Sequence, residues 1–343
     1  MAGRIVIGLD AMGGDFAPSE PVRGGYMAAK ENPDIDLILI GREEEIKKYL
    51  PSDLPNIRIC HASEVISMED PPALSVRRKK DSSISVGAEL LKKKEISAFV
   101  SVGNTGAVVS AATLKARLLP GIERPGLAVV FPTMKGTPVI VIDVGANIDT
   151  KPTHLLQYGL MATVYCRAMW DGVDDPKVGI LNIGEEEGKG ISTYKEAASL
   201  LKQSGLNFVG NVEGKDIFKG VVDIVVMDGF VGNAVLKVSE GAAEAVVKLL
   251  KQEIYESSWW TKIGAILFLL PAYKRLKKKI DYSEYGGALL LGINGVCIIG
   301  HGRSNARAVR NAIMVAVKEI KRKVNDRILK ELGNLKVNIG GEN

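Results

Sequence analysis

The sequence is poor in aromatic residues, in cysteine and in long uncharged apolar runs. Phe, Trp and Tyr make up 6% of the 343 residues, whereas the 37 glycines favour a fold with many tight strand-to-helix turns. Cys60, Cys166 and Cys297 are far apart and include no CxxC pair. This argues against a disulfide framework or a cysteine zinc site and fits a reducing cytoplasm. No uncharged apolar run approaches the roughly 20 residues that span a bilayer.

Several catalytic motifs are also missing. The chain has no G-x-S-x-G elbow, no H-E-x-x-H, no P-loop and no G-x-G-x-x-G after its first apolar run. Its three histidines are not spaced as a metal set. The net charge of +5 comes without a basic stripe that carries interleaved aromatics. We therefore expect no metal, no cofactor, no covalent nucleophile and no nucleic-acid partner.

The chain does contain a regular alternation of apolar β-branched runs and segments with helical periodicity. The runs predict strands at 4–10, 36–41, 57–62, 98–103, 127–132, 138–143, 177–184, 206–210 and 223–229. The segments between them predict helices at about 18–31, 43–50, 83–94, 105–118, 153–169, 191–203 and 231–256. Strands this apolar are buried on both faces, which predicts an α/β fold with a doubly wound, largely parallel sheet and helices on both faces.

Two short connections predict antiparallel exceptions. The runs at 127–132 and 138–143 are too close for a crossover helix. Asn294-Gly295 lies between two short apolar runs and is a strong hairpin signal. A final helix is expected at about 304–325. We expect one domain over residues 1–343, with a helical arm inserted at about 250–282.

Five glycine-containing loops follow predicted strands. They are DAMGGD (10–15), GNTGA (103–107), DVGANIDTKP (143–152), GEEEGKG (184–190) and DGFVGN (228–233). Ligands of open α/β sheets bind at the carboxyl ends of the strands, so we predict that the loops meet in one cleft. The alternative for any single loop is that its glycine only serves a turn.

The GNTGA loop is the best candidate for binding an anion. It closes a strand and opens a helix, so unpaired N–H groups and the helix dipole point at one place. The predicted anion site combines this loop with two cations: Gly103, Asn104, Thr105, Gly106, Lys151 and Lys189. The alternatives are that Asn104 or Thr105 only caps the helix and that Lys189 is only solvated.

The chain resembles the bacterial phosphate acyltransferase family of phospholipid synthesis in segments that extend from its first strand to its final helix. These segments are IGLDAMGGDFAPSEPV, SVGNTGA, DVGANIDTKP, NIGEEEGKG, DGFVGN and DYSEYGGALLLGINGVCIIGHGRSNARAVRNAI. The resemblance implies transfer of a long-chain fatty acyl group from acyl carrier protein to inorganic phosphate, giving acyl-phosphate for a membrane glycerol-3-phosphate acyltransferase. It also implies a fold like phosphotransacetylase and isopropylmalate dehydrogenase, and a homodimer without metal or nucleotide.

This reaction sets the roles that we predict for the remaining loop residues. Phosphate is itself a nucleophile, so it needs positioning next to a donor for the developing oxyanion. Asn147 or Asn233 is the predicted donor. Asp10 or Asp15 is predicted to accept the phosphate proton. The alternative for these two carboxylates is that they position a lysine or cap the next helix.

Three further residues complete the predicted site. Gly13 and Gly14 are expected to let the first loop approach the substrate closely. His301 is a candidate to protonate the leaving thiolate, the alternative being a packed structural histidine.

The segment IGAILFLLPAY (263–273), followed by KRLKKK (274–279), predicts contact with a membrane surface. It is too short to span, but an apolar helix with a polybasic flank can lie on an anionic bilayer. The predicted contacts are Ile266, Leu267, Phe268, Leu269 and Leu270. The alternative is a helix buried in a dimer interface. We therefore expect a cytoplasmic protein that associates peripherally with the membrane.

Basic runs at 77–80 and 92–94 are candidates for steering the acidic acyl carrier protein, although an exposed charge run needs no partner. Two other functions stay open. One is a nicotinamide-dependent decarboxylating dehydrogenase on a similar fold, against which the missing adenine-binding motif counts. The other is a non-enzymatic scaffold recruited to membranes through residues 263–279.

Overall fold

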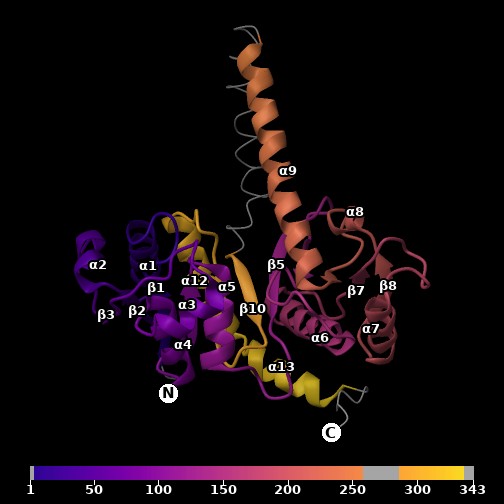
Figure 1. The fold of residues 1–343 in the computed structure, drawn as a ribbon, viewed down its shortest axis with the longest axis horizontal. Helices are drawn as coiled ribbons and strands as arrows, with labels where there is room; N and C mark the ends of the chain where they lie inside the picture. The colour runs from indigo at the N-terminus through magenta and orange to yellow at the C-terminus, as the bar shows by residue number, and fades with distance from the viewer. Residues whose placement is uncertain (1–3, 258–285, 336–343) are drawn as a thin grey trace.

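The computed structural model describes residues 4–257 and 286–335 (Figure 1). Its centre is an eleven-stranded sheet in the order β3-β2-β1-β4-β11-β10-β5-β6-β9-β7-β8. The strands are β1 (Ile5–Asp10), β2 (Ile35–Gly41), β3 (Ile57–His61), β4 (Ala98–Ser101), β5 (Gly126–Pro132), β6 (Pro138–Ile142), β7 (Val178–Leu181), β8 (Phe208–Val212), β9 (Ile224–Val226), β10 (Ala288–Leu291) and β11 (Val296–Ile299).

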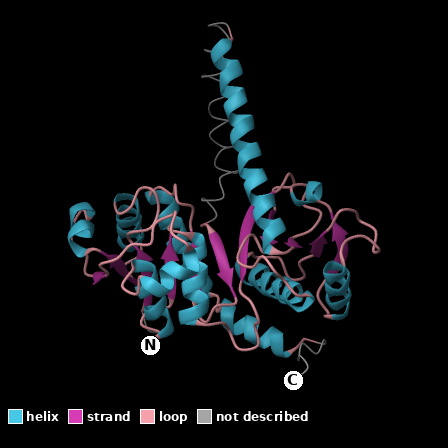
Figure 2. Ribbon diagram, viewed as in Figure 1, coloured by secondary structure: helices cyan, strands magenta, loops and turns pink. Residues whose placement is uncertain are grey.

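Helices cover both faces of the sheet (Figure 2). They are α1 (Ser19–Glu31), α2 (Glu43–Tyr49), α3 (Pro72–Arg78), α4 (Ser83–Lys92), α5 (Thr105–Ala111), α6 (Pro152–Met169), α7 (Ser192–Gln203), α8 (Gly214–Ile217), α9 (Gly229–Glu256), α12 (Ala306–Lys321) and α13 (Val324–Gly333). Alternate residues of one strand enter two separate cores. In β2, Leu37 and Leu39 join one core, and Ile38 and Ile40 the other. The sheet is therefore buried on both faces, as the apolar runs predict.

Both predicted hairpins are confirmed, because β5 pairs antiparallel with β6 and β10 with β11. Two predicted helices are interrupted in the structure. The helix predicted at 105–118 ends as α5 at Ala111, and a π-helical turn follows over Ala112–Ala116. The helix predicted at 304–325 is divided into α12 and α13, because Lys323 has a φ of +53°. A left-handed residue cannot continue an α-helix.

The two halves of the sheet run in opposite directions. Between β11 and β6 lie three successive antiparallel pairs, so β1, β4 and β11 point against β6, β9 and β7. The five glycine loops therefore leave strands of two opposite senses. Five steps separate β4 from β9, and a twist of 20–25° per step adds up to roughly 100–125°. Because the strands point in opposite directions, their carboxyl ends do not lie at one edge of a flat sheet. Whether the five loops can meet therefore depends on the twist of the sheet as well as on strand direction.

Helix α9 projects away from the rest of the molecule (Figure 1). It confirms the helix predicted at 231–256 and begins two residues earlier, at Gly229. The segment 263–279 and its predicted membrane contacts lie outside the described residues. In the ranges 4–257 and 286–335, no helix is long and apolar enough to cross a membrane.

Candidate active site

Asp10 joins the first two glycine loops. It is the last residue of β1 and is completely buried. Its Oδ1 accepts a hydrogen bond from the Met12 N–H (3.0 Å), and its Oδ2 accepts one from the Ser101 hydroxyl (2.7 Å). The same Ser101 Oγ accepts the Gly103 N–H (3.1 Å). Burial raises the pKa of Asp10, and the hydrogen bonds act in the opposite direction.

Gly13 and Gly14 bring neighbouring loops into close contact. A Cβ at Gly13 would lie 2.6 Å from the Gly103 nitrogen, and one at Gly14 would lie 2.9 Å from the Gly302 oxygen. Gly14 also has a φ of +90°, which favours glycine. The structure thus shows close approaches of these glycines to Gly103 and Gly302, and their approach to the substrate stays a prediction. Asp15 follows, with its N–H donating to the Gly302 oxygen (2.8 Å) and its side chain exposed.

Asn104 caps α5. Its Oδ1 accepts the Ala107 N–H (3.0 Å), which is the capping alternative considered above. Its Nδ2 is shared among the carbonyl oxygens of Ser67, Met68 and Asp70, at 3.1–3.2 Å. The carboxamide therefore anchors the 67–70 loop. The groups that remain to bind an anion at the start of α5 are the backbone N–H groups of Thr105 and Gly106.

His301 belongs to the same group of loops, on the turn after β11. Its Nδ1 accepts the Arg303 N–H (3.0 Å), so in the neutral ring the proton is on Nε2. The next residue, Gly302, is the one that contacts Asp15. Arg303 forms an ion pair with Glu244 of α9 at 3.6 Å. This loop therefore reaches from the first half of the sheet to the helix that follows β9.

Asp143 organises the loop after β6 and was missed by the sequence analysis. Its carboxylate is buried and accepts N–H bonds at 2.8–3.1 Å from four backbone nitrogens: Leu127, Gly145, Ala146 and Asn147. Burial raises its pKa, opposed by these hydrogen bonds. The signal that could have identified it is an aspartate directly after a buried strand and two positions before a glycine.

The two predicted oxyanion donors differ in availability. The Asn147 Nδ2 contacts the Pro125 oxygen (2.6 Å), the Tyr158 hydroxyl (2.9 Å) and Asp143 (3.2 Å), so this amide is engaged inside the protein. The Asn147 backbone carbonyl oxygen accepts the Gly229 N–H (2.9 Å), which ties the loop after β6 to the start of α9. Asn233 is exposed in the first turns of α9.

Lys189 lies on the loop after β7, and two asparagine side chains fix this loop. The Asn182 Nδ2 donates to the Lys189 carbonyl oxygen (3.1 Å) and to the Asn211 Oδ1 (3.1 Å). The Asn211 Nδ2 donates to the Glu186 oxygen (2.7 Å). The Lys189 side chain itself is exposed and passes over Gly184, where a Cβ would lie 3.3 Å from its Cγ.

A hydrogen bond joins the segment after β7 to the loop after β9. The Tyr194 hydroxyl donates to Asp228 Oδ2 (2.5 Å) and accepts the Asp228 N–H (3.0 Å). The contacts thus divide the predicted residues into two groups. The loops after β1, β4 and β11 form the first group, and the loops after β6, β9 and β7 form the second.

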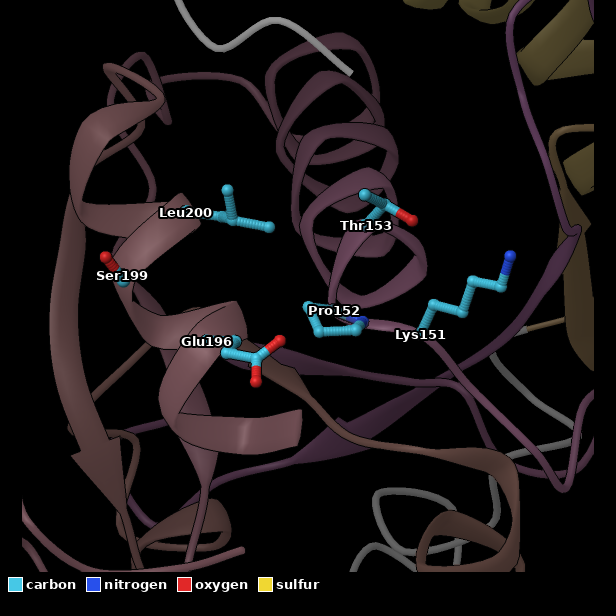
Figure 3. Close-up of a pocket in the computed structure, with 6 residues that line it drawn as sticks. All are labelled: Lys151, Pro152, Thr153, Glu196, Ser199 and Leu200. Carbon is cyan, nitrogen blue, oxygen red and sulfur yellow. The ribbon is translucent and has the colours of Figure 1, made fainter. Parts of the chain in front are cut away.

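Lys151 lies beside a cavity of about 440 Å³ between the start of α6 and α7 (Figure 3). The cavity is lined by Lys151, Pro152, Thr153, Glu196, Ser199 and Leu200. In the figure the Lys151 ammonium group points away from Glu196. The Lys151 N–H donates to the His154 Nδ1 (3.0 Å), and the His154 Nε2 lies 3.1 Å from Glu123. Burial lowers the pKa of His154, which favours the neutral ring.

Two of the three cysteines are core residues, and Cys60 in β3 is half-buried. Cys166 and Cys297 are buried, and burial raises the pKa of Cys297 to about 12, so it stays a thiol. Within the part of the chain that the structure describes, no cluster of His, Cys, Asp or Glu side chains is arranged to hold a metal ion.

Two solved structures share this architecture. A phosphotransacetylase from Streptococcus pyogenes superposes with a TM-score of 0.57 at 16% identity, over 94% of this chain and 95% of that one. The EutD phosphotransacetylase from Staphylococcus aureus gives a TM-score of 0.56 at 14% identity, over 92% and 94%. At such low identity the likeness shows the fold alone, and it confirms the predicted phosphotransacetylase-like sheet.

Sequence relatives cover nearly the whole chain. The family model described as "Fatty acid synthesis protein" matches residues 5–327. A phosphate acyltransferase from Dictyoglomus turgidum is 49% identical over 333 residues, which cover 96% of this chain and 98% of that protein. Another from Brevibacillus brevis is 47% identical over 327 residues, which cover 95% and 97%. These matches confirm the resemblance seen in the motifs.

Proposed function

This chain belongs to the Fatty acid synthesis protein family, and we propose on that premise that it moves a long-chain fatty acyl group from an acyl carrier protein to inorganic phosphate. The product is an acyl-phosphate, which a membrane glycerol-3-phosphate acyltransferase consumes in phospholipid synthesis. The observation that carries the proposal is the 47–49% identity, over almost the full chain, to relatives named phosphate acyltransferase. The alternative dehydrogenase is not favoured by these relatives.

In the proposed reaction a phosphate oxygen attacks the thioester carbonyl carbon, and the carbon–sulfur bond then breaks. Phosphate supplies the nucleophile, so the protein has to position it and stabilise charge on the carbonyl oxygen. Lys189 is the proposed phosphate cation, because it is exposed on a loop that side chains hold in place. Asn233 is the proposed oxyanion donor, because the carboxamide of Asn147 is engaged elsewhere.

The two predicted proton acceptors take different roles in the proposed mechanism. Asp15 is exposed, and its backbone is fixed by Gly302, so it can accept the phosphate proton. Asp10 is buried and both of its oxygens accept hydrogen bonds, so we assign it to holding the first group together. With Nδ1 accepting the Arg303 N–H, His301 carries its proton on Nε2 and can stabilise the leaving thiolate by donating a hydrogen bond. Protonating the thiolate requires the imidazolium, in which Nδ1 no longer accepts the Arg303 N–H.

The substrate is proposed to lie between the two groups of loops. Backbone N–H groups of Thr105 and Gly106 are proposed to bind it from the first group, and Lys189, Lys151 and Asn233 from the second. The Gly103 N–H is already donated to the Ser101 Oγ. The Arg303–Glu244 ion pair supports this arrangement. Glu244 is fifteen residues beyond Gly229, so the first group meets α9 roughly 22 Å along the helix at 1.5 Å per residue. The base of α9 itself is tied to the second group by the Gly229 N–H bond to the Asn147 backbone oxygen.

A homodimer formed through α9 is part of the proposal. Large apolar side chains are exposed along this projecting helix, including Val238, Val246, Leu249 and Leu250. A helix that leaves an apolar stripe in water gains stability by packing on a second copy. The chain that follows, residues 263–279, keeps its proposed role as a peripheral contact with an anionic membrane.

The acyl carrier protein is the proposed acyl donor, and exposed cations support its approach. Arg77, Arg78 and Lys80 are exposed around the end of α3, as are the lysines at 92–94 around the end of α4. Lys79 is the exception in the first run, because it pairs with Asp70 at 2.5 Å. Complementary charge of this kind raises the rate of encounter with an acidic partner.

The direct test is to incubate the purified protein with palmitoyl-acyl carrier protein and phosphate and to measure free thiol. We expect thiol release that requires phosphate, and an acyl-phosphate product that hydroxylamine traps. A matched reaction without phosphate gives the background. Absence of phosphate-dependent release with every acyl chain length would overturn the proposal.

A further inference from the structure

Four of the most exposed large apolar side chains in the described residues occur in the loops of the second group and in the first turn of α9. They are Ile148 after β6, Ile183 and Ile191 after β7, and Phe230 after β9, with exposed fractions of 76%, 82%, 66% and 67%. We call these four residues the apolar rim. Exposed apolar side chains scattered singly need no explanation, but a group of them marks a binding surface.

The rim residues share one edge of the sheet. Strands β6, β9 and β7 are parallel neighbours, so the loops at their carboxyl ends are adjacent. The Gly229 N–H bond to the Asn147 backbone oxygen joins the start of α9, which carries Phe230, to the loop that carries Ile148. The Tyr194–Asp228 bond joins the segment that follows Ile191 to the N-cap of the same helix.

Two rim residues lie close in sequence to the cations of the proposed site. Ile148 follows Asn147 and precedes Lys151 by three positions, and Ile191 follows Lys189 by two. The surface therefore combines exposed apolar side chains with two cations. A ligand with a hydrocarbon tail and an anionic end matches both features at once, whereas inorganic phosphate uses only the cations.

We propose that the apolar rim binds the hydrocarbon chain of the acyl group and thereby sets the chain-length preference. This rests on the proposed function and extends it to a part of the substrate that has no polar atoms. The chain gains binding energy in proportion to the apolar area that it and the rim remove from water, so each further methylene adds to the preference. A second copy of the protein or a bilayer is a different occupant, and the experiment separates them.

The experiment compares butyryl and palmitoyl carrier thioesters in an Ile148→Ser, Ile183→Ser double variant. Met134→Ser is the matched control, because Met134 is 77% exposed in the β5–β6 turn, at the other end of β6 from the rim. We expect the ratio of kcat/KM for palmitoyl over butyryl to fall at least tenfold in the double variant and to stay within twofold in the control. Far-UV circular dichroism checks that both variants are folded.

Three results would overturn the inference. An unchanged ratio, or an equal loss with both thioesters, removes the rim from the acyl site. A shift from dimer to monomer on size exclusion shows that a second subunit covers the rim. Loss of binding to anionic vesicles without a change in the ratio shows that a bilayer covers it. Failure of the proposed function looks different, because the unmodified protein then releases no thiol with either donor.

Discussion

Asn182 donates a hydrogen bond from Nδ2 to the backbone carbonyl oxygen of Lys189, 3.1 Å away, and so ties the far end of the GEEEGKG loop to the end of β7. Asn211, at the end of β8, holds the middle of the loop through the Glu186 oxygen. The Lys189 side chain is long and exposed, but its backbone is fixed by these two amides. A cation that is fixed in this way loses less freedom when it binds phosphate.

We therefore expect Asn182→Ala and Asn211→Ala to raise the KM for phosphate several-fold, with a smaller effect on the KM for the acyl carrier. Asn207→Ala is the control, since Asn207 Nδ2 makes the same kind of bond, to the Asp175 oxygen at 3.1 Å, before the start of β8. Steady-state kinetics with phosphate varied gives the comparison. Adding Lys189→Ala should produce little further loss, because the asparagines act through that lysine. Equal effects of all three asparagine variants would contradict this.

Asp10 is expected to affect stability more than chemistry. Asp10→Ala leaves the buried Ser101 hydroxyl and Met12 N–H without an acceptor. Each unsatisfied donor should lower the free energy of unfolding by about 1–3 kcal/mol. Urea unfolding measures the loss. Asp15→Asn is the matched variant, and it should lower kcat while leaving the free energy of unfolding nearly unchanged, because Asp15 is exposed. The reverse pattern would make Asp10 the proton acceptor.

The buried carboxyl group of Glu319 should make the stability of the protein depend on pH. It is buried in α12, its Oε2 has no hydrogen-bond partner in the structure, and burial raises its pKa from 4.5 to about 8. The folded state therefore holds its proton over a range in which the unfolded state has released it. Between pH 4.5 and 8 the free energy of unfolding should fall as pH rises, by at most about 1.4 kcal/mol per pH unit.

Glu319→Gln should remove this part of the pH dependence and raise stability at pH 8. Glu44→Gln is the control, because Glu44 is exposed on α2. Chemical denaturation at several pH values provides the measurement. A profile of unchanged slope in Glu319→Gln would show that another group causes the dependence.

The fold was largely predictable because its signals are local. Apolar runs of strand length, the short β5–β6 connection and the Asn294-Gly295 turn each act within a few residues. The reversal of direction between the two halves of the sheet was not predictable. It results from the order in which β11, β10 and β5 pair, and β10 joins β5 across a long stretch of chain.

The candidate site was predictable in its loops but not in its contacts. The motifs identify which loops carry polar residues, but the Ser101–Asp10 bond joins residues 91 positions apart. The same limit applies to Asn147, whose carboxamide is engaged by Pro125 and Tyr158. A sequence shows that an asparagine follows a strand, whereas only the packed structure shows whether its amide is already used.

Substitution of Gly232 would test how closely α9 packs on the loop after β6. A Cβ at Gly232 would lie 1.8 Å from the Asp143 carbonyl oxygen, which is part of the backbone and cannot move aside cheaply. Gly241, nine residues further along the same helix, has nothing within 4 Å of the corresponding position. Glycine in an exposed helix costs about 1 kcal/mol relative to alanine, so Gly241→Ala should leave stability unchanged or raise it.

Gly232→Ala should lower the free energy of unfolding by several kcal/mol, since overpacking against a fixed backbone exceeds the gain in helix propensity. Because Asn233 is the next residue, the same substitution should also lower kcat. Thermal and urea unfolding of the two variants, measured side by side, separates steric overlap from helix propensity, and equal stability of the two would show that α9 does not rest on Asp143.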